Sequence, residues 1–207
     1  MEKKLSLEAV RVLGVLIEKE RSTPDYYPMT VNALVNGCNQ KSNRFPVVEY
    51  GEIAVIRALD ELYTQRLSGH ASVAGGRAEK YRHAAAQHWN LDVPSLAVLA
   101  SLTLRGAQTV GELRTHTTRM ASFESMEEVA EVLQALSDRE EPLAMQVGRR
   151  AGQKGLRFAH LLSGEPIQEE EVSEPPSSTE STADLDELRE RLTRLEAEFE
   201  AFRKQFE

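Results

Sequence analysis

The sequence has a single cysteine, few aromatic residues and no long apolar run. Cys38 is the only cysteine in 207 residues, so no internal disulfide can form, and a cytoplasmic location is expected. No apolar run approaches the ~20 residues that a membrane-spanning helix needs, and the first residues lack the apolar stretch of a secretory signal. With 41% hydrophobic residues, the chain is predicted to be a soluble globular protein of one or two domains.

Motifs of catalysis are also missing. The sequence has no glycine-rich phosphate loop, no paired-carboxylate motif and no GxSxG. Cys38 lacks a His or Asp partner in a useful context and is interpreted as a small buried hydrophobe. The five histidines are dispersed, and a metal site built from His83, His88 and a distant third ligand is the open alternative. An enzyme is therefore the least supported class, and we expect no cofactor and no metal.

The charge is unevenly distributed along the chain. Residues 163–207 hold 14 acidic and 5 basic side chains, whereas residues 1–162 hold 19 and 20, so the net charge of -8 comes from the C-terminal part. Neither part has the strongly basic balance that is typical of nucleic-acid-binding proteins.

The first third of the chain predicts two helices. Residues 7–20 repeat apolar side chains at helical spacing, and Arg11 and Glu18 fall on the face expected to point to water. After a loop that contains two prolines, Thr30 is the predicted N-cap of a short second helix.

A polar connector and a third helix follow. Residues 39–46 are longer than the usual turn of a helix-turn-helix, so they hold either an extra helical turn or an ordered loop. A helix is expected over 49–66, and two alternating runs, 67–73 and 79–84, predict a hairpin. The side chains of this third helix expected to face the core are Ile53, Ile56, Leu59, Leu62 and Tyr63.

The pattern recurs further on. An apolar helix is predicted to begin at Asp92-Val93-Pro94 and to stop at Arg105-Gly106, and residues 143–162 alternate as a second hairpin. Two capping boxes are predicted between them: Thr109 with Glu112, and Ser125 with Glu128.

The two patterns align as an internal repeat. Leu34 corresponds to Leu113, Leu59 to Leu133 and Tyr81 to Phe158, at offsets of 79, 74 and 77 residues. The drop in the offset places an insertion in the first copy between Leu34 and Leu59. The predicted fold is mainly α with small β wings (α+β), with two tandem winged helix-turn-helix domains over 5–88 and 92–163.

Beyond these domains the composition changes. Residues 164–183 are rich in Pro, Ser, Thr and Glu and are predicted to be a disordered acidic linker. Residues 184–207 carry an unbroken heptad seam, which predicts a coiled-coil helix and a weak parallel homodimer. The seam consists of Leu185, Leu188, Leu192, Leu195, Phe199, Phe202 and Phe206.

Several short motifs match those of a known family. They are Thr23-Pro24-Asp25, Tyr27-Pro28, Asn32-Ala33-Leu34, Cys38-Asn39-Gln40-Lys41-Ser42-Asn43-Arg44, Lys80-Tyr81-Arg82-His83, Leu104-Arg105-Gly106, Gly111-Glu112-Leu113-Arg114 and His160-Leu161-Leu162-Ser163-Gly164-Glu165. Over residues 5–165 the chain resembles the YceH-like family of uncharacterised bacterial proteins. The resemblance implies a tandem winged-helix fold; it implies no activity, substrate or catalytic residue.

The connector and the two wings are the candidate nucleic-acid contacts, because basic hairpins bind phosphates. The alternatives are solvated turns for the wings and local capping by the amides of the connector. The candidate contacts are Asn39, Gln40, Lys41, Asn43, Arg44, Arg77, Lys80, Arg82, Arg149, Arg150, Lys154 and Arg157.

The helices that would enter a major groove carry the opposite charge. Residues 49–66 hold four acids and two bases, and residues 122–141 hold seven acids and one base. Base reading uses mostly Arg, Lys, Asn and Gln. Two functions stay open: a DNA-associated, regulator-like protein that contacts double-stranded DNA, or a protein–protein adaptor that uses its acidic helix faces without binding DNA. The sequence does not identify a DNA target, a partner protein or an effector.

Overall fold

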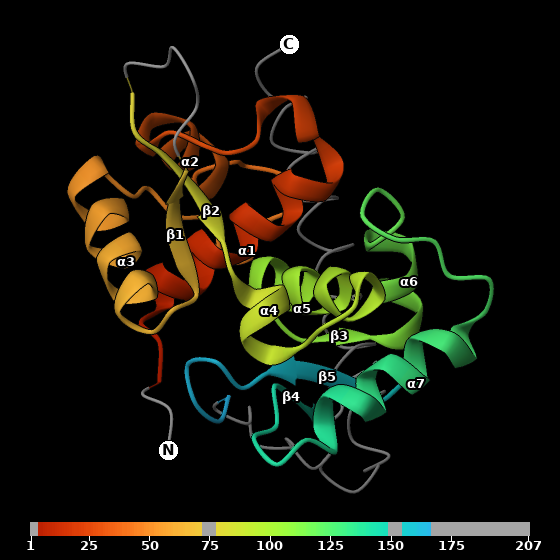
Figure 1. Cartoon of the computed structure of the whole chain (residues 1–207). Coiled ribbons are helices and arrows are strands. Elements are labelled where there is room, and N and C mark those ends of the chain that lie inside the picture. The colour runs from red at the N-terminus through yellow and green to blue at the C-terminus, as the bar shows by residue number, and fades with distance from the viewer. Residues whose placement is uncertain (1–3, 72–77, 149–154, 167–207) are drawn as a thin grey trace, which may run out of the picture. The chain divides into compact units, whose positions relative to one another are not determined.

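The computed structural model describes residues 4–71, 78–148 and 155–166, which belong to one compact unit, Met1–Gln168 (Figure 1). This part of the chain is α+β, with helices and small antiparallel sheets. In chain order its elements are α1 (Leu7–Ser22), η1 (Pro24–Tyr26), α2 (Val31–Cys38), α3 (Glu52–Thr64), β1 (Ser68–Ala71), β2 (Lys80–His83), α4 (Ala85–Trp89), α5 (Val93–Arg105), β3 (Gln108–Thr109), α6 (Val110–His116), α7 (Met126–Ser137), β4 (Ala144–Val147) and β5 (Arg157–His160). The predicted linker 164–183 beyond residue 166, and the whole predicted helix 184–207, lie outside the described residues.

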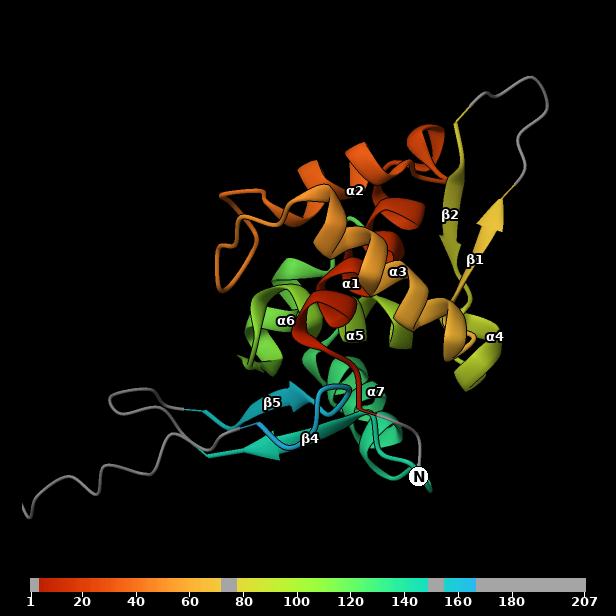
Figure 2. The ribbon, with the colours of Figure 1, turned by 90° about the vertical axis from the view of Figure 1, so that its left-hand side faces the viewer.

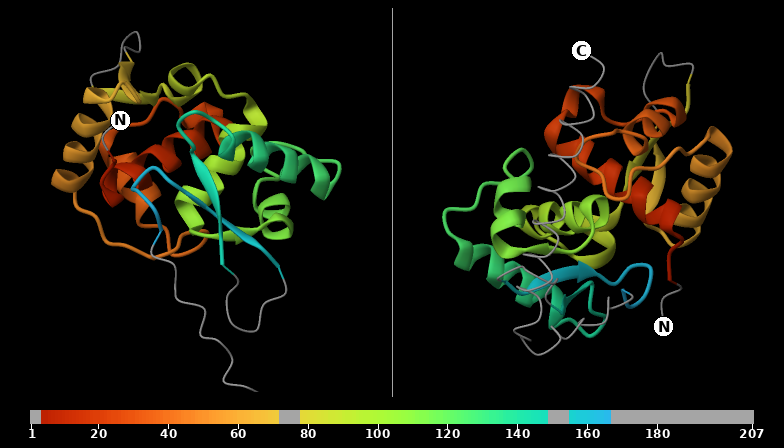
Figure 3. Two further views of the ribbon diagram at one scale, coloured as in Figure 1. Left: turned by 90° about the horizontal axis from the view of Figure 1, so that it is seen from below. Right: turned by 180° about the vertical axis from the view of Figure 1, so that it is seen from behind.

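Helices α1 and α5 pack on each other at the centre of the described body, and their apolar side chains belong to one buried cluster (Figure 3). Gly14 of α1 allows this close approach, because a Cβ atom there would lie 2.4 Å from the hydroxyl oxygen of Thr103 on α5. The first half of the chain, which ends near α4, and the second half, which starts at α5, therefore share one core.

The halves have the same order of elements. In each, a long first helix is followed by a short helix, another helix and a hairpin. Leu34 and Leu113 are both fully buried, as the predicted alignment requires. Tyr81 pairs with Met29 just before α2, and Phe158 pairs with Gln108 just before α6, so the second hairpin strand makes an equivalent bridge in each half.

Two antiparallel sheets complete the fold. β1 pairs with β2, and the second sheet has the order β3-β5-β4, whose hairpin extends from the body in Figure 2. The sequence predicts the two hairpins but not β3, a two-residue strand that is too short to show an alternating pattern.

Most predicted helix boundaries are confirmed. Thr30 caps α2 by accepting a hydrogen bond from the Ala33 N–H, and Asp92 caps α5. Gly106 ends α5 with a positive φ of 74°. The predicted connector is an ordered loop and not an extra helical turn.

The predicted inner face of α3 is wrong in part. Leu59 and Leu62 are buried, but Ile53, Ile56 and Tyr63 are 69%, 43% and 60% exposed. The helix starts at Glu52 and turns a different side toward the core. This side begins at Val55 and continues with the residues 3, 4 and 7 positions after it. Because apolar residues cover most of this helix, spacing alone could not decide which of two overlapping faces is buried. The buried residues are Val55, Ala58, Leu59 and Leu62.

The outer face predicted for α1 is also wrong. Arg11 is buried, and its guanidinium donates to the carbonyl of Pro46 at 2.8 Å. The side chain of Glu18 is largely covered. Both residues face the connector, which packs along α1 where a simple amphipathic helix would meet water. In the described residues, no helix has the length and apolar character needed to cross a membrane.

Candidate binding surfaces

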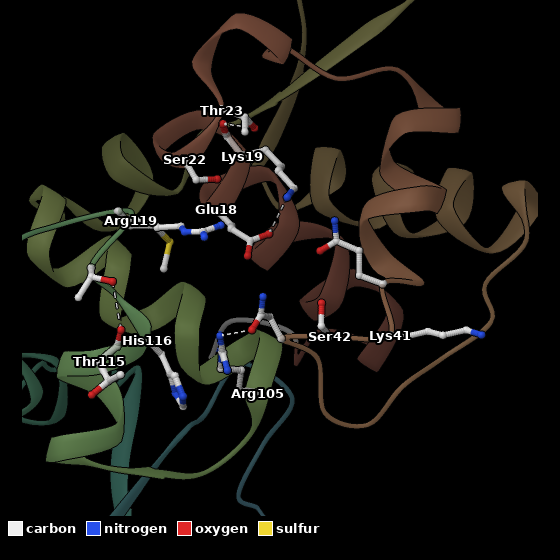
Figure 4. Close-up of a pocket in the computed structure, with 14 residues that line it drawn as sticks. Glu18, Lys19, Ser22, Thr23, Lys41, Ser42, Arg105, Thr115, His116 and Arg119 are labelled. Carbon is white, nitrogen blue, oxygen red and sulfur yellow. Dashed lines mark hydrogen bonds and ion pairs between the residues drawn. The ribbon is translucent and has the colours of Figure 1, made fainter.

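A cleft of about 670 Å³ lies where the two halves meet (Figure 4). We call it the polar cleft, because polar and charged side chains line it almost entirely. It is formed by the end of α1, the connector, the end of α5 and residues 115–120. The lining residues are Glu18, Lys19, Ser22, Thr23, Gln40, Lys41, Ser42, Asn43, Arg105, Thr115, His116, Thr118, Arg119 and Met120.

A buried ion pair holds the connector beside the cleft. The Arg44 guanidinium donates to both carboxylate oxygens of Glu18, at 2.6 and 3.2 Å, and to the carbonyls of Gly37 and Asn43. Burial acts to raise the pKa of Glu18, but the hydrogen bonds and charge of Arg44, with the help of Lys19, outweigh it and hold that pKa below its usual value. Glu18 is therefore a carboxylate at neutral pH.

Backbone and amide contacts fix the rest of the connector. Asn39 donates to the Tyr50 carbonyl and accepts from the Tyr50 N–H. The Phe45 N–H donates to the carbonyl of Leu104, at the end of α5. The connector is thus attached to both central helices, and residues 40–43 are held at the edge of the cleft.

Cationic side chains predominate around the cleft. Four cationic side chains and one carboxylate line it, and the carboxylate already has its own partners. Arg105 donates to the side-chain oxygen of Asn43 at 2.6 Å, which links α5 to the connector. In Figure 4, Arg105 and Arg119 point toward the central space, whereas Lys41 extends away from it. Among the described residues, Arg119 makes no ion pair or hydrogen bond through its side chain, so its charge is available to a ligand.

His116 lines the cleft in its neutral form. Its Nδ1 lies 2.7 Å from the side-chain oxygen of Gln108. Burial lowers the pKa of His116, the nearby charge of Arg105 lowers it further, and Glu112 only partly opposes them. The ring is therefore a neutral hydrogen-bonding group at pH 7.

The connector residues predicted to contact nucleic acid divide into two groups. Gln40, Lys41 and Asn43 line the polar cleft. Asn39 is occupied by Tyr50, which is the predicted alternative of local capping, and Arg44 is 6% exposed and ion-paired inside the protein. The burial of Arg44 leaves it unable to reach a phosphate on the surface.

The predicted wing contacts that the structure describes do not line the cleft. Lys80 and Arg82 lie on β2, half-buried and exposed respectively. The Arg157 guanidinium donates to the carbonyl of Ala107, which ties β5 to the segment before β3. The remaining wing residues, Arg77, Arg149, Arg150 and Lys154, lie outside the described residues.

Three cationic residues of the cleft were not predicted from the sequence as contacts: Lys19, Arg105 and Arg119. Each belongs to a different segment, and none stands in a basic run. Two signals were present. Arg105 belongs to one of the family motifs, and Arg119 lies within residues 114–123, the segment of the second repeat that corresponds to the polar connector.

Two helices expose faces of contrasting chemistry. On α3, Ile53, Ile56 and Tyr63 form an exposed apolar line that continues into the ring of His70 on β1, 5.7 Å from the Tyr63 ring. We call Ile53, Ile56, Asp60 and Tyr63 the α3 ridge. On α7 the charged side chains that are exposed are the carboxylates of Glu127 and Glu131, beside exposed Met126, Ala130, Gln134 and Ala135.

The remaining candidate residues are Cys38 and the histidines of the metal-site alternative. Cys38 is fully buried, as predicted, and burial raises the pKa of its thiol to about 12. The Nε2 atom of His83 lies 2.9 Å from a carboxylate oxygen of Glu20. In the described ranges, no three His, Cys, Asp or Glu side chains come together as metal ligands.

Comparison with known proteins gives consistent matches. Residues 5–153 match the family described as "Protein of unknown function, DUF480". The chain is 47% identical to a UPF0502 protein of Geobacter metallireducens and 44% identical to a UPF0502 protein of Geobacter sulfurreducens, with both chains covered completely in each case. It is 54% identical to a UPF0502 protein of Geotalea uraniireducens, over 80% of this chain and 75% of that one.

Proposed function

The chain belongs to the DUF480, or UPF0502, family of uncharacterised bacterial proteins, and we propose that it is a non-enzymatic protein that binds double-stranded DNA through the polar cleft. One observation carries the proposal. Cations from α1, the connector, α5 and the segment after α6 gather around a single cleft in a chain whose net charge is -8. A local positive surface on an acidic protein attracts phosphates without attracting every polyanion to the whole molecule.

The contacts are those of backbone binding. Arg105 and Arg119 supply guanidinium groups, and Gln40 and Asn43 supply amides at the edge of the cleft. Such groups position a protein on the sugar–phosphate backbone and carry little sequence information by themselves. The proposed activity is therefore DNA association of low sequence specificity, which suits a regulator-like role in which a partner or the wings supply the specificity.

We interpret each half as a winged helix in which α3 or α7 stands where a DNA-reading helix would stand. The chemistry of these two helices argues against base reading. The outer side of α3 presents Ile53 and Ile56, and the outer side of α7 presents carboxylates. Neither set matches the donors and acceptors of base edges, and the carboxylates repel phosphates.

A salt-titrated binding assay with random duplex DNA tests the proposal. Arg119→Ala and Arg105→Ala are each expected to weaken binding and to reduce the slope of log K against log salt by about 1, since each removes one phosphate contact.

Arg21→Ala is the matched control. Arg21 is exposed near the end of α1 and does not line the cleft. Its replacement by alanine removes one positive charge, as the two cleft variants do. It is expected to leave the salt slope unchanged. The absence of binding at low salt, or an effect of Arg21→Ala equal to that of Arg119→Ala, would overturn the proposal.

Protein binding through α7 is the second candidate function. Three exposed carboxylates on this helix and at its C-cap favour it, because a basic partner segment would complement Glu127, Glu131 and Asp138. Under this alternative, charge reversal at Glu131 reduces capture of a basic partner, while DNA binding is absent for every variant.

A further inference from the structure

We infer that the α3 ridge is an interface between two copies of this chain, which pair through antiparallel α3 helices. This inference is independent of the proposed function, because the ridge contributes no residue to the polar cleft. It rests on the exposure, spacing and charge of Arg57 and the four ridge residues, all on one helix.

The ridge has the spacing of a helix–helix seam. Ile53, Ile56, Asp60 and Tyr63 are separated by 3, 4 and 3 residues, which places them in one line along the exposed side of α3. Three of the four are large apolar side chains. In Figure 2, α3 lies across the side of the molecule that faces the viewer, and the described residues leave the outer side of this helix uncovered.

Antiparallel pairing makes the ridge self-complementary. In two antiparallel helices, residues whose numbers add to a constant lie opposite each other. With a twofold axis near residue 58, Ile53 of one copy meets Tyr63 of the other, and Ile56 lies beside Asp60. The same apolar surface is then used twice, as a twofold-symmetric interface requires.

The charges agree with the same register. Asp60 places a carboxylate in an otherwise apolar line, and Arg57 lies at its edge. In the described part of the chain, neither of these side chains has an ion-pair partner. Antiparallel pairing brings Arg57 of each copy against Asp60 of the other. A parallel arrangement would instead place like charges side by side.

The interface is small. One pair of helices buries less than the about 1,200 Å² that is the lower limit for stable complexes, so we expect a weak and concentration-dependent dimer. A second contact elsewhere in the chain would strengthen it by raising the effective concentration of the two ridges.

Charge-reversal variants of the full-length chain test the register. Sedimentation velocity over a series of concentrations gives the dimer dissociation constant. Asp60→Arg and Arg57→Asp are each expected to raise this constant at least about tenfold, because each places like charges across the seam. The double variant, Arg57→Asp with Asp60→Arg, restores opposite charges and is expected to recover association.

Two more variants test the apolar contact. Ile56→Asp is expected to weaken association, whereas Met126→Asp is expected to leave it unchanged, because Met126 is 53% exposed on α7 and lies outside the ridge. Circular dichroism checks that each variant is folded. A monomeric wild type at every concentration, no response to Ile56→Asp, or a double variant that stays as weak as the single ones would each overturn the inference.

Discussion

The connector of the first half is fastened by Arg44 and that of the second half by Arg114, in different surroundings. Arg44 is buried and forms an ion pair with Glu18 besides its bonds to carbonyls. Arg114 is half-buried and donates only to the carbonyls of Phe123 and Glu124, at 3.3 and 2.6 Å. The segment between α2 and α3, residues 39–51, is longer than the segment between α6 and α7, residues 117–125. The stronger attachment of the longer segment positions residues 40–43 at the cleft.

The two arginines are expected to differ in their contribution to stability. Arg44→Ala is expected to lower the free energy of unfolding by about 3 kcal/mol, because it leaves a largely buried carboxylate without its main partner. Arg114→Ala is expected to cost about 1 kcal/mol, the value of one or two surface hydrogen bonds. Urea denaturation measures both. Equal costs would contradict the difference drawn between the two connectors.

The pH dependence of stability isolates the ion pair. Because the pKa of Glu18 is lowered by folding, the pair contributes fully above the unfolded value of about 4.5, and this contribution is lost as the pH falls through the lower folded pKa. Arg44→Ala is expected to remove this loss. A variant that keeps the wild-type acid dependence would show that Glu18 is held by other groups.

A substitution at the contact between α1 and α5 is expected to have the next largest effect on the free energy of unfolding. Gly14→Ala forces α1 and α5 apart at Thr103 and is expected to lower the free energy of unfolding by about 1–3 kcal/mol. Gly111→Ala is the control, since no atom lies within 4 Å of the added Cβ and α6 gains a better helix former. That variant is expected to raise the free energy of unfolding by about 0.5 kcal/mol. A neutral Gly14→Ala would mean that the two halves do not depend on this close approach.

His83 and His160 occupy equivalent positions in the two hairpins, 77 residues apart. His83 has Glu20 as its partner, whereas burial lowers the pKa of His160 to about 4. His160 stays neutral in the folded state but is protonated in the unfolded chain below about pH 6.5. The free energy of unfolding therefore decreases as the pH falls from about 6.5 to about 4, and His160 has no effect above that range. The loss is expected to be about 1–2 kcal/mol, less than the full shift implies, because the residue as a whole retains some contact with solvent.

His160→Gln tests this difference between the halves. The variant is expected to flatten the fall in the free energy of unfolding between pH 6.5 and pH 4, measured by urea denaturation at several pH values. His83→Gln is the matched comparison in the first half. If both variants gave the same pH profile as the wild type, the neutral state of His160 would not contribute to stability.

The features predicted correctly from the sequence are those that depend on residues close together in the chain. Thr30 and Asp92 accept hydrogen bonds within three residues, and Leu34 and Leu113 recur in similar local patterns. The order of helices and hairpins therefore followed from spacing and capping.

The features that could not be predicted depend on distant segments. The polar cleft joins Lys19, Arg105 and Arg119, which are far apart in the sequence and meet only because α1 packs on α5. The face of α3 that turns inward depends on its tertiary neighbours, so Ile53 and Ile56 were placed on the wrong side. Arg11 faces the connector, which no local pattern could indicate.

The N-caps of α6 and α7, Thr109 and Ser125, differ in how completely they form a capping box. Thr109 and Glu112 form both bonds of a capping box. In the second predicted box, the Ser125 hydroxyl accepts from the Glu128 N–H, but the Glu128 carboxylate accepts from the N–H of Glu124 and not from that of Ser125. The second predicted box is therefore only half formed.

Thr109→Ala is expected to lower the free energy of unfolding by about 1–2 kcal/mol and Ser125→Ala by about 0.5–1 kcal/mol. The difference arises because Thr109 also ends β3, so a frayed start of α6 weakens the bridge to Arg157, whereas Ser125 follows a loop that can absorb fraying. Hydrogen exchange measures the fraying at the Glu112 and Glu128 amides, each of which loses its acceptor. Protection is expected to fall at both amides, but to spread into β5 only for Thr109→Ala. Fraying that stays within the first turn of α6 would mean that the cap and the sheet of the second half are independent.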